Sequence, residues 1–253
     1  MTNQKISTCC DNIREAWYQR QMLVRADGSL VRQLKSICRR LCGGDKVAGT
    51  KLYKKLRRAK VDSPDLLALG ANIVLLKHEI ATQLALDEQE RMLYSHVRSL
   101  PVWKWIESIR GVSENALASV VGEAGDLNNY ANPGKLWKRM GLALVEYKGE
   151  QVRQRKALDK KLATLMGYSP KRRAAMYIIG GTIIKARKGA TGVAADLLAY
   201  YEAEKAKASG KGLSKAHSHY RAQGHMEKRF LKLLWREWTG RGQEWVEPQR
   251  LAA

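Results

Sequence analysis

A stretch near the middle of the chain has residue types and spacing that could hold a phosphate group. Ile106 and Ile109 are placed to face inward from one helix, and Ser113 is suited to cap a second. Gly111 permits a backbone conformation that a side chain would disfavour. A helical hairpin of this kind can aim its amides at a phosphate without reading any base. We therefore expect phosphate binding by the backbone amides of Gly111, Val112 and Ser113. A hairpin that only packs is the alternative, and the acidic residues that follow are its support.

Cysteines and histidines are the candidates for metal ligands. The cysteines are Cys9, Cys10, Cys38 and Cys42, and the clustered histidines are His217, His219 and His225. The cysteine spacing matches no zinc-ribbon pattern, and cysteine is commonly buried as a free thiol. The histidines lie in a basic segment with no acidic or thiol ligand close by in sequence, so we expect surface or phosphate contacts. The sequence predicts packed thiols, no metal site and no cofactor.

The net charge of the chain indicates an anionic partner. The chain has 46 Lys and Arg residues against 24 Asp and Glu residues, a formal charge of +22. Residues 1–60 hold 15 basic and 4 acidic residues, residues 61–133 hold 5 and 10, and residues 134–253 hold 26 and 10. The three segments therefore carry +11, −5 and +16. Nucleic acid is the commonest partner for such a chain, although charges on solvated helix faces are an alternative.

Neither a membrane span nor a secretory signal is predicted. No stretch approaches the roughly 18 consecutive apolar residues of a spanning helix. Asp11 and Glu15 stand where a signal peptide would have an apolar run. We expect a cytoplasmic protein that does not bind membranes.

Helical periodicity dominates the chain, and no alternating pattern predicts a strand. We expect two basic helices over 11–26 and 29–42, separated by Asp27-Gly28, and a short basic helix over 46–58. Ser63-Pro64 is a helix start signal, so a long helix is expected to about His96.

An apolar stripe on this long helix could form a dimer. Leu69, Ile73, Leu76 and Ile80 repeat at four-three-four spacing. The stripe spans fewer than three heptads, so an ordinary core-facing helix is an equal alternative to a homodimer through the helix at 64–96.

Together these patterns predict an all-α, multi-helical fold with a long connecting helix and a helix-hairpin-helix core. We expect a basic N-terminal helical region over 1–60, the connecting helix over 61–100, the hairpin-containing domain over 101–190, and basic C-terminal helices over 191–253.

The residues after the hairpin resemble a known family. Ile109-Arg110-Gly111-Val112-Ser113 is followed by Glu123-Ala124-Gly125-Asp126-Leu127, by Pro133 to Leu136, and by Gly141-Leu142-Ala143. This order resembles the C-terminal domain of the bacterial insertion-sequence transposases and pilin-gene invertases, which join a RuvC-like acidic domain to a serine-bearing C-terminal domain. Tyr168-Ser169-Pro170-Lys171-Arg172-Arg173 is similar to the start of the family's basic helix. The resemblance covers roughly residues 64–238 and is firm over 106–143.

Two departures from the family bear on catalysis. Residues 1–60 are too short for the RuvC-like domain, so no acidic tetrad is carried over. Gly149 stands at the position expected for the catalytic serine, and Ser169 is better suited to cap a helix. Gly180-Gly181 lies inside an apolar helical run and indicates close packing rather than a phosphate loop. We assign no catalytic residue.

The resemblance implies a DNA-binding protein of transposition or recombination, in the bacterial cytoplasm or nucleoid. The expected phosphate-binding residues, besides the hairpin, are Lys135, Lys138, Arg139, Lys148, Arg153, Arg155, Lys156, Lys171, Arg172 and Arg173. One alternative is an active compact transposase that completes its site with a partner chain. Another is a structured-RNA binder, because the resembled transposases use a guide RNA and basic charge does not distinguish RNA from DNA.

Overall fold

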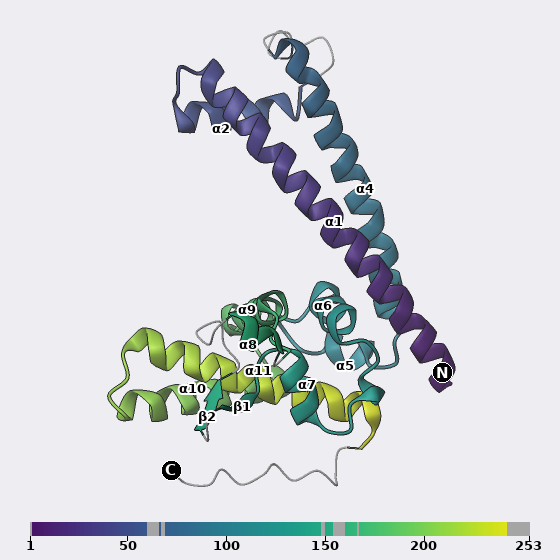
Figure 1. The fold of residues 1–253 in the computed structure, drawn as a ribbon, viewed down its shortest axis with the longest axis vertical. Coiled ribbons are helices and arrows are strands. Elements are labelled where there is room, and N and C mark those ends of the chain that lie inside the picture. Colours follow the sequence, from purple (N-terminus) through teal and green to yellow (C-terminus); the bar gives the residue numbers. More distant parts are fainter. Residues whose placement is uncertain are drawn as a thin grey trace. The chain divides into compact units, whose positions relative to one another are not determined.

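The structure is a computed structural model that describes residues 2–59, 66, 69–147, 150–153, 160–165 and 167–241. These residues form a multi-helical, all-α fold, as predicted (Figure 1). Within these ranges, no helix combines the length and apolar composition that a membrane span requires. The chain divides into two compact units, and we describe each by itself. Unit 1 contains Met1–Arg14 and Tyr94–Ala253, and unit 2 contains Glu15–Leu93.

The N-terminal helix is longer than the sequence predicts. Helix α1 runs without a break over Asn3–Leu41, so the predicted interruption at Asp27-Gly28 is wrong. A glycine inside a helix costs only about 1 kcal/mol relative to alanine. Buried residues on both sides of Gly28, Trp17 and Leu34 among them, compensate for that cost.

Helix α2, Lys46–Leu56, confirms the short basic helix and is fixed by local signals at its start. Gly43 and Gly44 adopt positive φ angles of 63° and 94° after the end of α1. The Asp45 side chain then caps α2 by accepting hydrogen bonds from the amides of residues 47 and 48. A Cβ atom at Gly49 would lie 2.6 Å from the Cα atom of Arg39, so glycine allows α2 to approach the α1 backbone.

Helix α4 begins later than predicted. The helix covers Ile73–Arg98 and follows a 3-10 turn, η1, over Gly70–Asn72, where Gly70 has a φ of +54°. The positive φ at Gly70 is incompatible with one continuous helix from residue 64. The predicted start signal, Ser63-Pro64, lies outside the described residues.

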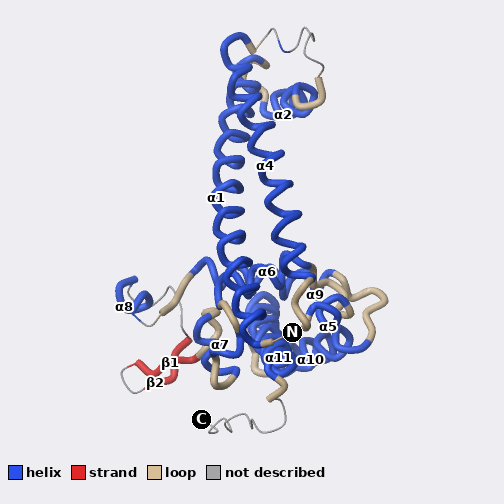
Figure 2. The backbone as a smooth tube through the Cα atoms, turned by 90° about the vertical axis from the view of Figure 1, so that its right-hand side faces the viewer, coloured by secondary structure: helices blue, strands red, loops and turns tan. Residues whose placement is uncertain are grey.

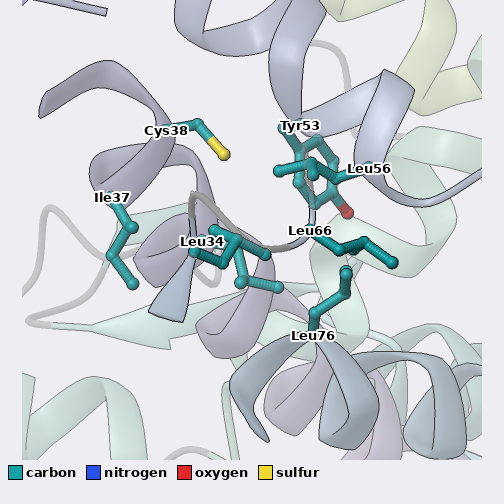
Figure 3. Packing of buried hydrophobic residues seen from close by; sticks show 8 residues of the cluster. Leu34, Ile37, Cys38, Tyr53, Leu56, Leu66 and Leu76 are labelled. Atoms are coloured by element: carbon teal, nitrogen blue, oxygen red, sulfur yellow. The ribbon is translucent and has the colours of Figure 1, made fainter. Parts of the chain in front are cut away.

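The core of unit 2 joins α1, α2 and the region of α4 (Figure 3). Its buried residues are Leu34, Ile37, Cys38, Tyr53, Leu56, Leu66, Leu69 and Leu76. Two members of the predicted dimer stripe, Leu69 and Leu76, therefore pack inside the chain, whereas Ile80 is 38% exposed. Ile73 is partly buried against the same core, so packing within the chain explains three of the four residues of the stripe. The homodimer stays a prediction.

Unit 1 contains the hairpin and the C-terminal helices. Its elements are α5 (Trp103–Glu107), α6 (Glu114–Ala124), η2 (Leu127–Asn129), α7 (Pro133–Arg139), β1 (Leu144–Tyr147), β2 (Glu150–Arg153), α8 (Lys160–Leu165), α9 (Pro170–Lys185), α10 (Gly192–Gly210) and α11 (Lys215–Thr239). Helices α10 and α11 pack along each other, and α11 also contacts α7 and α9. Fully buried side chains from these elements include Leu117, Phe230 and Trp235.

A short antiparallel hairpin interrupts this helical unit (Figure 2). Strand β1 pairs with β2 in the register Leu144 to Arg153 and Tyr147 to Glu150. The sequence predicts no strand, and this strand pair shows that the prediction is wrong here. Four-residue strands are too short for their alternation to stand out from a helical pattern.

The two consecutive glycines of α9 differ in their surroundings: Gly180 is packed against another helix, and Gly181 is not. A Cβ atom at Gly180 would lie 2.8 Å from Oε1 of Glu227 and 2.9 Å from Nε2 of Gln223, both on α11. A Cβ atom at Gly181 would meet no atom within 4 Å. The predicted close packing is thus confirmed at Gly180 alone.

We expect Gly180→Ala to lower the free energy of unfolding by about 1–3 kcal/mol, because its methyl group displaces two buried, hydrogen-bonded side chains. Gly181→Ala is the matched control and should raise that free energy by up to about 1 kcal/mol, since alanine favours the helix. Urea denaturation of both variants measures the difference. Equal effects from the two substitutions would show that Gly180 does not hold α9 against α11.

Candidate nucleic-acid interface

The predicted hairpin has the expected backbone. Ile106 and Ile109 are fully buried, and Gly111 has a φ of +91°. Ser113 is the N-cap residue of α6 with extended backbone angles, although its side chain makes no capping hydrogen bond. The local signals in the sequence therefore located both helices and the turn between them.

The structure shows a packing role for this turn. A Cβ atom at Gly111 would lie 2.8 Å from the carbonyl oxygen of Thr182 and 2.9 Å from the Cα atom of Ile183, both on α9. The amide of Val112 donates to the carbonyl of Ile109 at 3.0 Å, so this donor is already used within the hairpin. Glycine is required here because the turn touches α9. Phosphate binding by the amides of Gly111 and Ser113 stays a prediction.

A buried carboxylate gathers several of the predicted basic residues. Glu123, at the end of α6, is 5% exposed. Its carboxylate lies 3.3 Å from Nζ of Lys171 and 3.4 Å from Nε of Arg172, both in the first turn of α9. Nε of Arg139, at the end of α7, donates to the backbone carbonyl of Glu123 at 2.9 Å. Three predicted phosphate-binding residues from two helices thus meet at one residue.

A fourth cation joins this group from the start of the chain. A Cβ atom at Gly125 would lie 3.8 Å from Cδ of Arg14, whose residue is exposed. Burial raises the pKa of Tyr130, while the positive charges of Arg139, Arg172 and Arg14 act to lower that pKa. We call Arg14, Glu123, Arg139, Lys171 and Arg172 the Glu123 cluster. The cluster places two cations on the Glu123 carboxylate, a third on the Glu123 backbone carbonyl and a fourth beside Gly125. Sequence reasoning missed Arg14 because it lies far from the motif.

The Glu-Ala-Gly-Asp segment that carries the family resemblance has structural roles here. Glu123 holds the cluster, and Gly125 ends α6 with a φ of 79°. Asp126 caps η2 through the amide of Asn128, and it accepts a hydrogen bond from Nε1 of Trp238 at 2.9 Å. The segment therefore ties α6 to η2 and to α11.

Two further predicted residues, Lys135 and Lys138, add positive charge on α7. Lys135 and Lys138 lie on α7 beside Arg139, and both are exposed. The remaining predicted residues lie outside the described part of the chain: Lys148, Arg155, Lys156 and the side chain of Arg153. The position that corresponds to the family's serine, Gly149, also lies outside it. Ser169 caps α9 as expected, accepting a hydrogen bond from the amide of Arg172.

The last predicted cation, Arg173, belongs to a different buried site. Its Nη1 atom lies 2.6 Å from Oε2 of Glu227 on α11, a side chain with no exposed surface. Gln223 donates from Nε2 to Oε1 of Glu227 at 3.0 Å and to the carbonyl of Tyr177 at 2.8 Å. Burial raises the pKa of Glu227 to about 7, although Arg173 and Gln223 favour the charged form. Arg173 therefore compensates a buried charge.

The cysteines and histidines lie in separate environments. Sγ of Cys9 lies 3.3 Å from Oγ of Ser99, and burial raises the pKa of Cys10 to about 12. Nδ1 of His225 lies 3.0 Å from Glu204. Among the described residues, no three His, Cys, Asp or Glu side chains are grouped so that they could hold a metal ion.

Sequence reasoning missed a groove in unit 2. The groove has a volume of about 500 Å³ and lies between the end of α2 and the middle of α4. Its lining residues are Tyr53, Lys54, Arg57, Arg58, Ile80, Gln83 and Leu84. The basic end of the 46–58 helix and the apolar residue Ile80 are both visible in the sequence. Helical spacing relates only residues within one helix, so it does not predict that these two segments, about 25 residues apart, line one groove.

The pKa of Glu227 predicts a pH-dependent stability. Because the folded-state pKa is raised from 4.5 to about 7, this group's contribution to stability is present below pH 4.5 and is lost as the pH rises through 7. The contribution is on the order of 3 kcal/mol. Glu227→Gln cannot ionise, so the stability of this variant relative to the wild type should increase between pH 4 and pH 8. Urea denaturation across this range measures the difference, and a difference that does not vary with pH would contradict the prediction.

Comparison with known proteins identifies no relative of this chain. A scan against models of protein families finds no match, and neither the curated proteins nor the solved structures contain a significant match. The resemblance to the transposase domain therefore stays a prediction.

Proposed function

We propose that this protein binds double-stranded DNA through the sugar-phosphate backbone and serves DNA transposition or recombination. The observation that carries the proposal is the Glu123 cluster, in which Lys171 and Arg172 contact one buried carboxylate, Arg139 contacts the backbone carbonyl of the same residue, and Arg14 lies beside Gly125. The exposed Lys135 and Lys138 extend the same positive character along α7.

The cluster is suited to bind phosphate because its cations are held in place and stay accessible. Contacts to Glu123 orient Lys171 and Arg172, whose side chains remain 38% and 19% exposed. A side chain that is already oriented loses less conformational entropy when it binds a ligand. Among its own five members the cluster has four cations and one carboxylate, so it attracts a phosphate. The N-terminus of α9, a helix of 16 residues, adds a partial positive charge at the same place.

The chemistry of these groups favours backbone contacts over base recognition. Lysine and arginine side chains on phosphates fix the position of a protein on DNA but carry no sequence information. Binding should therefore be similar for different sequences and should weaken as salt increases. The family resemblance over 106–143 supports a role in transposition or recombination, and we assign no catalytic residue to this chain.

We expect the double variant Lys135→Ala/Lys138→Ala to weaken binding to all duplex sequences alike. The slope of log affinity against log salt should decrease in magnitude by about 2, one for each lost phosphate contact. Fluorescence anisotropy with two unrelated DNA duplexes at several salt concentrations measures both effects. These two lysines are preferable to Lys171, Arg172 and Arg173, because removing those cations leaves buried carboxylates unpaired and destabilises the fold.

The matched control is Lys211→Ala/Lys215→Ala, which removes the same charge from exposed residues at the connection of α10 and α11. This control should change the salt slope less. Equal slopes for the two double variants would exclude α7 from the interface. Tighter binding of the wild type to duplex RNA than to duplex DNA would replace the proposal with an RNA-binding function.

A further inference from the structure

The groove in unit 2 combines an apolar wall with positively charged side chains. Ile80 and Leu84 lie one turn apart on α4, and they are 38% and 64% exposed. Large apolar side chains that line a concave surface together indicate a ligand with an apolar face.

The opposite side of the groove is cationic. Lys54, Arg57 and Arg58 line it from the end of α2 and the residues just after that helix. Among the described residues, no carboxylate forms an ion pair with Lys54 or Arg58. Within the part of the chain that the structure describes, these two charges are therefore available to an anion.

A buried ion pair fixes the third cation. Nε of Arg57 lies 3.1 Å from Oε1 of Glu79, whose side chain has no exposed surface. The hydroxyl of Tyr53 donates to the same oxygen at 3.1 Å. Burial and the charge of Glu79 raise the pKa of Tyr53 to about 12, so the tyrosine stays a neutral donor. The network sets the position of Arg57, whose side chain is 38% exposed. Its planar guanidinium can stack on a flat ring.

We propose that this groove binds one unpaired nucleotide of a nucleic-acid strand. The base lies against Ile80 and Leu84, and the flanking phosphates contact Lys54 and Arg58. A free phosphate ion would leave the apolar wall unused, and an uncharged ligand would leave the two cations unused. The groove volume of about 500 Å³ is in the range of pockets that hold a single small ligand.

The charge of the surrounding segment supports a polyanionic partner. Residues 15–59 contain 12 basic and 3 acidic residues. The inference rests on the nucleic-acid binding proposed above, but it names a separate surface and an unpaired strand instead of a duplex.

The test compares two 12-nucleotide strands of equal charge with the full-length protein. One strand is oligo(dT), and the other has abasic sites in place of every base. Anisotropy should show that the wild type binds oligo(dT) about tenfold more tightly than the abasic strand, because only oligo(dT) can place a base in the groove. Leu84→Ser and Ile80→Ser change no charge, and each should reduce this ratio to near one.

The charge variants test the phosphate contacts. Lys54→Ala/Arg58→Ala should weaken binding to both strands by at least about fivefold more than the control Lys46→Ala/Lys51→Ala, which removes two exposed cations of α2 outside the groove. An unchanged ratio in both serine variants, with melting temperatures equal to that of the wild type, would overturn the inference. Equal losses in the two double variants would also overturn it, because general charge attraction would then explain binding.

Duplex binding, measured in parallel, separates the two proposals. Wild-type protein that binds duplex DNA but shows no preference for oligo(dT) over the abasic strand refutes the groove site alone. Wild-type protein that prefers oligo(dT) and loses the preference in Leu84→Ser, while binding no duplex, supports the groove and refutes the duplex proposal.

Discussion

Three consecutive cations at the start of α9 are divided between two buried carboxylates, and the arrangement of unit 1 depends on this division. Lys171 and Arg172 contact Glu123 of α6, whereas Arg173 contacts Glu227 of α11. A buried carboxylate without partners is strongly destabilising, so each contact also fixes the helix that supplies it. The first turn of α9 is thereby held between α6 and α11. Glycine also allows close approach at two places on α9, where the turn at Gly111 touches this helix and where Gly180 of α9 faces α11.

The parts of the fold that depend on local chemistry could be predicted from the sequence. The hairpin was located because a glycine with positive φ and the cap position at Ser113 follow directly from residue type. Helix α2 is also predictable, and in the structure two glycines with positive φ angles end the preceding helix and Asp45 caps α2. The errors arose where packing outweighed local preference. Asp27-Gly28 reads as a break, yet tertiary packing on both sides keeps α1 continuous.

The candidate interface was only partly predictable, because sequence does not reveal which cations have partners inside the chain. Arg173 is adjacent to Arg172, but its carboxylate partner is 54 residues away in sequence. Arg14 joins the Glu123 cluster from the other end of the chain, and the groove combines residues of α2 and α4. The charge pattern of a sequence indicates which segments attract anions. Only the fold shows which of their cations are paired with carboxylates of the same chain and which can bind a ligand.

The close approach at Gly49 has a consequence for the evolution of this chain. A side chain there would meet the Cα and N atoms of Arg39, and backbone atoms cannot be repacked as side chains can. Exposed lysines and arginines of α2 can interchange or drift without affecting the fold, but any descendant sequence that keeps α2 against α1 must keep glycine at this position. Gly111 is constrained in the same way by the backbone of α9. A comparison with distant sequences should therefore give these two glycine positions more weight than the exposed charges of α2.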